Sequence, residues 1–135
     1  MDDLIIFKYI VFIISNMTKE IDLQEIGTFV KALHCQIRWE IIDVLQTGPK
    51  TVDQIMESLM FKQEDLQNNV KDNCQGTCHN GHGREIKKPT LYYHLRELES
   101  VGIIEVAKLQ ETEHKRAPEK VWKLNMDKLI INFKR

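Results

Sequence analysis

The chain has 135 residues, of which 19 are basic and 20 acidic, and 42% are hydrophobic. This composition is typical of a globular domain with a sizeable core, and it excludes both wholesale disorder and a uniformly basic nucleic-acid binder. The near-neutral total hides a segregation of charge. Residues 53–73 carry five acids against two bases, whereas residues 84–96 carry four bases against one acid. We therefore expect an acidic body joined to basic segments.

An apolar run spans residues 4–14. It is shorter than the about 20 residues that a membrane span requires, and Asp2 and Asp3 precede it where a secretory signal would be positive. The sequence therefore predicts a cytoplasmic protein that does not associate with a membrane. Residues 1–17 are treated as a separate segment, which either packs against the core or a partner chain, or lies upstream of a true start at Met17.

Two helices are predicted between Ile21 and Gln46, with a break near His34, because apolar residues recur there at the spacing of an amphipathic helix. The second helix is expected to end at Gly48-Pro49. Its inward stripe is apolar and consists of Leu33, Ile37, Ile41 and Val44. Its polar side chains are expected to point elsewhere, namely Arg38, Glu40 and Asp43.

A short third helix is predicted to follow Thr51. Thr51 and Gln54 have the spacing of a capping box, in which each side chain bonds the backbone N–H of the other. The buried face of this helix is Val52, Ile55, Met56 and Leu59. The polar stretch from there to Asn73 predicts a further helix that is held more weakly. Residues 73–83 contain three glycines among small polar residues, which predicts a loop.

Pro89 predicts the start of another helix, because proline suits the first helical turn, where its missing N–H has no partner. Gly102 would terminate this helix after Ser100. Its core-facing residues are Leu91, Leu95 and Leu98. Its opposite face is Pro89, Thr90, Tyr93, Arg96, Glu97 and Ser100, with Tyr92 at the edge. Preceded by Lys87 and Lys88, this face either reads a nucleic-acid groove while the lysines bind phosphates, or is an ordinary solvated helix face.

Residues 103–106 and 121–124 predict two strands joined by a loop that contains Lys115 and Arg116. They would form a hairpin with a basic tip. Helix, glycine turn, strand, basic loop and return strand is the order of a winged helix-turn-helix. Residues 126–135 predict a short terminal helix, because their apolar side chains have a spacing compatible with one helix face.

Three stretches, residues 33–59, 89–106 and 116–124, resemble ArsR-type winged-helix transcription regulators, particularly archaeal ones. The most specific element is the run Thr90-Leu91-Tyr92-Tyr93-His94-Leu95, followed by Leu98 and Gly102, which is similar to the recognition helix of the family and its exit turn. The resemblance implies an α+β fold, mainly helical, with a winged helix-turn-helix over residues 18–125 and a two- or three-stranded β-wing.

The resemblance also implies a homodimer on palindromic double-stranded DNA, with residues 126–135 as a dimer contact. The recognition helix, residues 89–100, would enter the major groove, and the wing, residues 107–124, would contact the backbone or minor groove. His94 would be a packed structural residue rather than a ligand. The implied DNA-binding residues are Lys87, Lys88, Thr90, Tyr92, Tyr93, Arg96, Lys115 and Arg116.

Residues 60–86 form an insertion in the turn and depart from the family, whose turn is short. The thiolate motif with which the family commonly binds metal is also missing. The insertion nevertheless contains four residue types that can ligate zinc: Cys74, Cys78, His79 and His82. Adjacent Cys78 and His79 rarely reach one ion together. Two interpretations therefore stay open: a zinc site, which could make the protein a metal- or thiol-responsive regulator, and a polar loop with free thiols or a Cys74–Cys78 disulfide.

His34 and Cys35 could complete such a site if the insertion folds back, although Cys35 is otherwise expected to be an ordinary core or interface thiol. The sequence contains no glycine-rich phosphate loop, metalloprotease helix or nucleophile elbow, so an enzyme is not expected. The leading interpretation is a DNA-binding transcription regulator. The alternative is a winged-helix module for protein contacts within a transcription assembly, which Tyr92 and Tyr93 would also suit.

Overall fold

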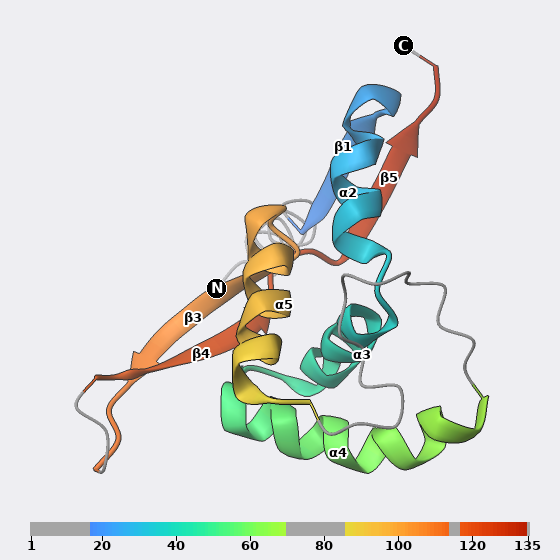
Figure 1. Cartoon of the computed structure of the whole chain (residues 1–135). Helices are drawn as coiled ribbons and strands as arrows, with labels where there is room; N and C mark the ends of the chain where they lie inside the picture. Colours follow the sequence, from blue (N-terminus) through green and yellow to red (C-terminus); the bar gives the residue numbers. More distant parts are fainter. Residues whose placement is uncertain (1–16, 70–85, 114–116, 135) are drawn as a thin grey trace, which may run out of the picture.

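The computed structural model describes residues 17–69, 86–113 and 117–134, and for residues 61–69 the backbone alone. These parts of the chain form a mixed α+β structure, which confirms the predicted class (Figure 1). Their strands form two separate small sheets. Their helices are α2 (Ile26–Leu33), α3 (Gln36–Val44), α4 (Val52–Asn69) and α5 (Lys88–Ser100).

The first two helices meet at a corner formed by His34 and Cys35, which confirms the predicted break. Of the predicted inward stripe, Ile37, Ile41 and Val44 are buried and Leu33 is half-buried. The start of the helical region was predicted too early. Ile21 belongs to strand β1 (Thr18–Asp22), which pairs with a strand near the other end of the chain. The side chain of Ile21 is buried.

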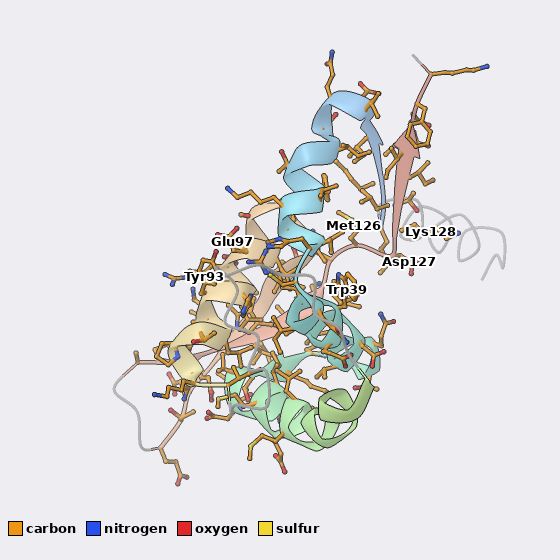
Figure 2. All side chains as sticks on the ribbon, turned by 45° about the vertical axis from the view of Figure 1, so that its right-hand side comes forward. Trp39, Tyr93, Glu97, Met126, Asp127 and Lys128 are labelled. Carbon is orange, nitrogen blue, oxygen red and sulfur yellow. The ribbon has the colours of Figure 1, made fainter. Side chains whose placement is uncertain are left out.

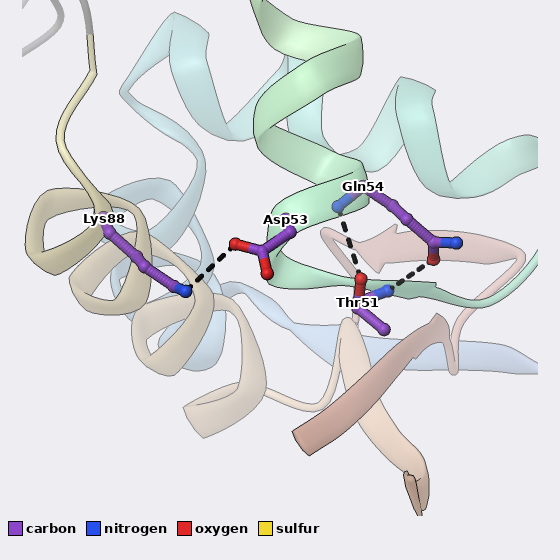
Figure 3. Close-up of polar contacts among 4 residues, drawn as sticks. All are labelled: Thr51, Asp53, Gln54 and Lys88. Atoms are coloured by element: carbon purple, nitrogen blue, oxygen red, sulfur yellow. Dashed lines mark hydrogen bonds and ion pairs between the residues drawn. The ribbon is translucent and has the colours of Figure 1, made fainter. Parts of the chain in front are cut away.

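Helix α4 begins with the predicted capping box (Figure 3). The backbone N–H of Thr51 donates to Gln54 Oε1 at 2.9 Å, and the backbone N–H of Gln54 donates to Thr51 Oγ1 at 3.3 Å. The two bonds satisfy N–H groups that have no partner within the helix. Val52, Ile55 and Leu59 are buried as predicted, and Met56 is partly buried.

The prediction of a short helix followed by a separate, weaker one was wrong. Helix α4 continues for 18 residues to Asn69. Residues 52–69 contain no glycine or proline, so nothing in them interrupts the backbone hydrogen bonds. The loss of apolar residues after Leu59 therefore does not end the helix. The first part of the proposed insertion, residues 60–69, extends this helix.

Helix α5 begins and ends as the sequence predicts. Pro89 lies in its first turn. At its end the N–H of Ile103 donates to Leu98 O at 3.1 Å and the N–H of Gly102 donates to Glu99 O at 2.9 Å, a Schellman motif. Gly102 has a φ of 80°, which glycine adopts without strain. Strand β3 therefore starts close beneath the last turn of α5.

A three-stranded antiparallel sheet has the order β2-β4-β3, and its two longer strands, β3 and β4, come from the second half of the chain. Its long hairpin projects from the helices on the left of Figure 1. Val106 pairs with Trp122, and a bulge follows at Ala107, which increases local twist. The strands are β2 (Lys50–Thr51), β3 (Ile104–Gln110) and β4 (Glu119–Leu124), the last two longer than predicted.

The predicted terminal helix at residues 126–135 is wrong. Strand β5 (Lys128–Asn132) pairs in parallel with β1 instead, with Ile21 opposite Ile131. The consecutive branched side chains Leu129-Ile130-Ile131 favour an extended backbone, and a short apolar run cannot be assigned by spacing alone. Helix α2 lies beside this ribbon (Figure 1). No helix in the described ranges combines the length and the apolar character needed to cross a membrane.

Candidate nucleic-acid interface

The candidate interface is the outward face of α5. Leu91, Leu95 and Leu98 have no exposed surface, so this helix is fixed against the core along one stripe. The side chains on the opposite side are thereby turned to solvent. Tyr92 is 36% exposed and Tyr93 is 41% exposed. Both are therefore available to a partner.

Six of the eight predicted DNA-binding residues lie on α5 or directly before it. Lys87 and Arg96 are exposed, and Lys88 and Thr90 are half-buried. The other two, Tyr92 and Tyr93, are exposed. Lys115 and Arg116, predicted for the hairpin tip, lie outside the described residues.

Charge is distributed unevenly along α5. Lys87 and Lys88 lie at its N-terminus, where the helix dipole adds partial positive charge. Glu97 and Glu99 lie near its C-terminus, and Glu97 is labelled in Figure 2. The N-terminal half of the helix is therefore the part that suits a phosphate backbone.

Lys88 is held by an ion pair that the sequence analysis missed. Its Nζ lies 3.0 Å from Asp53 Oδ1 of α4 (Figure 3). The side chains are 39% and 57% exposed, so solvent screening keeps the contribution of the pair to stability small. The pair nevertheless places a carboxylate beside a predicted phosphate ligand. Sequence spacing gave no signal for it, because it depends on how α4 and α5 pack.

Arg38 was expected to point away from the core, and this prediction was wrong. The residue is 1% exposed. Its Nη1 donates to the carbonyl oxygens of Lys31 and Ala32 at 3.1 and 3.0 Å, and its Nε donates to His94 Nδ1 at 3.0 Å. These acceptors explain the burial, because a buried guanidinium must have its donors satisfied.

His94 is the packed structural residue that the sequence predicted. It is fully buried in the middle of α5. Since its Nδ1 accepts the bond from Arg38, the ring is neutral with its proton on Nε2. The guanidinium of Arg38 also lies over the ring of Tyr93, with its Cζ 5.6 Å from the ring centroid. Figure 2 shows Tyr93 on α5.

The hairpin carries both signs of charge. Lys123 of β4 forms an ion pair with Glu105 of β3, 3.0 Å apart. Lys120 lies over the ring of Trp122, with 5.6 Å between its Nζ and the ring centroid. Lys108 is exposed. The lysines of the described hairpin strands thus lie apart from one another and do not form a single basic patch.

The predicted metal ligands Cys74, Cys78, His79 and His82 lie outside the described residues. Within the described ranges no group of three or more His, Cys, Asp or Glu residues is arranged to bind a metal ion. Cys35 is buried as expected, but it is disulfide-bonded rather than an ordinary thiol.

No protein-family model matches the chain, and no curated protein matches it either. The function is therefore inferred from the chemistry and geometry of α5 and its surroundings.

Proposed function

We propose that the protein is a DNA-binding transcription regulator of the ArsR type with a winged helix-turn-helix, a binding protein rather than an enzyme. The observation that carries this proposal is the outward face of α5. It combines hydroxyl, aromatic and guanidinium groups on a helix anchored by three fully buried leucines, with two lysines at its N-terminus. A rigid helix with this composition fits a major groove.

In this proposal α4 and α5 are the two helices of the motif, and α5 is the recognition helix. Arg96 donates to a guanine edge, Thr90 and the tyrosines contact bases or sugars, and Lys87 binds a phosphate. The β3–β4 hairpin is the wing, which lies along the backbone or in the minor groove. Two copies of the chain bind a palindromic site, so that each α5 reads one half-site.

The test compares two alanine variants on two DNA ligands. The ligands are a duplex selected by the unmodified protein from a random-sequence pool, and an unselected random duplex. We expect Arg96→Ala to cost about 1–3 kcal/mol on the selected duplex and to relax specificity. Lys87→Ala should weaken both duplexes alike and lower the slope of log K against log salt by about one.

Absence of salt-dependent duplex binding at low ionic strength would refute the proposal. Equal effects of both variants on both duplexes would refute the assignment of Arg96 to base reading. The exposed Tyr92 and Tyr93 favour one other function, a winged-helix module that binds a protein. In that case a Tyr92→Ala variant would lose a protein partner in pull-down experiments and would leave duplex binding unchanged.

A further inference from the structure

Arg38 is a buried cation whose partners come from two other helices. It lies on α3, its Nη1 donates to the carbonyls of Lys31 and Ala32 at the end of α2, and its Nε donates to His94 on α5. The two carbonyls are in the last turn of α2, where backbone acceptors have no partner within the helix. One planar guanidinium therefore ties the α2–α3 corner to the middle of α5.

The same guanidinium reaches the outward face of α5. His94 is buried and Tyr93, the residue before it, is 41% exposed. The side chain of His94 therefore points into the core and that of Tyr93 toward solvent. Arg38 contacts both, with its Cζ 5.6 Å from the Tyr93 ring centroid. The attraction of a cation to an aromatic face restricts the orientation of that ring. Tyr92, also exposed on α5, provides the internal comparison.

A contribution to stability does not by itself explain why an arginine occupies this buried position. A buried ion is expensive to desolvate, and an apolar side chain of similar volume often serves a core equally well. A guanidinium differs from it by holding several groups in one fixed, planar geometry. Here the groups held are the end of α2, the centre of α5 and an exposed aromatic ring of the proposed recognition surface.

We propose that Arg38 is a positioning residue for DNA reading, which fixes the ring of Tyr93 and the seating of α5 before DNA binds. This inference rests on the proposed function. A ring that is already ordered loses less conformational freedom on binding. Loss of Arg38 should therefore weaken binding to a specific DNA sequence. Binding to phosphates through Lys87 and Lys88 is unaffected.

The first measurement needs no DNA. In protein labelled with ¹³C on the tyrosine rings, Tyr93 should be more ordered than Tyr92 by relaxation NMR. In the Arg38→Lys variant the ring resonances of Tyr93 should shift and its order should approach that of Tyr92, whose own signals stay in place. Equal mobility of the two rings in the unmodified protein would overturn the proposal, even if Arg38→Lys does not fold.

The second measurement uses the selected and random duplexes. Arg38→Lys should lower affinity for the selected duplex about tenfold, the size of one lost base contact, and leave the random duplex and the salt slope unchanged. In a Tyr93→Ala background the same substitution should have no further effect, because both changes remove one interaction. Additive losses, or equal losses on both duplexes in a variant whose circular dichroism shows it folded, would overturn the proposal.

The failure of the proposed function has a different signature. If the unmodified protein binds neither duplex, the DNA-reading role of Arg38 falls with the proposed function, whatever the tyrosine spectra show. If the unmodified protein binds the selected duplex and Arg38→Lys keeps full affinity for it, only the positioning role is lost.

Discussion

Arg38 of α3 and His94 of α5 are joined by a buried hydrogen bond. A cationic donor and a neutral ring nitrogen meet 3.0 Å apart where both residues are buried. Water cannot replace either partner at such a position, so the loss of one leaves the other unsatisfied. Substitution of a buried histidine should therefore destabilise the fold more than substitution of an exposed histidine in the same chain.

His94→Leu should therefore lower the free energy of unfolding by about 1–3 kcal/mol, because it leaves Arg38 Nε buried without its acceptor. Urea unfolding measures the change through the shift of the midpoint. The matched control is His34→Leu. His34 is exposed and its Nδ1 lies 2.6 Å from Lys31 O, so water can replace that bond and the loss should be about 0.5 kcal/mol. Equal losses in the two variants would contradict this account.

At the scale of elements, the sequence predicts what is local and misses what is not. The capping box of Thr51 and Gln54, the leucine stripe of α5 and the turn at Gly102 each depend on residues within a few positions of one another. The burial of Arg38 and the pair between Lys88 and Asp53 depend on how helices pack, which spacing does not encode. Strand β5 was missed for the same reason, since its partner β1 lies at the other end of the described chain.

The contact between α4 and α5 has a consequence for binding. Asp53 forms a 3.0 Å ion pair with Lys88, so in the proposed complex it would compete with DNA phosphate for this lysine. Asp53→Asn should therefore raise affinity for any duplex by about 1.5- to 5-fold at low salt, the equivalent of one surface ion pair, and steepen the salt dependence. Fluorescence anisotropy over a salt series would measure both.

The control for that experiment is Glu57→Gln, one turn further along α4, which changes net charge equally at an exposed acid. It should have a smaller effect than Asp53→Asn. If the two variants raise affinity equally, the change reflects overall charge and the ion pair has no part in it.

On the scale of the whole molecule, apolar side chains are exposed around the ribbon of β1 and β5. Phe133 is 71% exposed, Val30 of α2 is 59% exposed and Leu23 is 53% exposed. Parallel strands are usually covered on both faces, and a two-stranded ribbon is marginal by itself. This end of the molecule is therefore the one best suited to the homodimer that we propose.

Phe133→Lys should shift the protein from dimer to monomer, because it places a charge in the proposed apolar contact. Light scattering coupled to size-exclusion chromatography measures the mass. The matched control is Leu109→Lys on the hairpin, where the leucine is 60% exposed, and it should leave the dimer intact. A monomeric unmodified protein, or equal dissociation of the two variants, would rule out this contact.

The parallel ribbon also orders the events of folding. Its strands are the first and the last that the structure describes, so pairing Thr18 with Lys128 closes a loop that contains α2 to α5 and the whole hairpin. Closing so long a loop is entropically costly and slow, whereas helices and the hairpin form from near neighbours. The ribbon should thus assemble after the helices have docked. Helix α5 can therefore pack its leucines against the core while β1 and β5 are still unpaired.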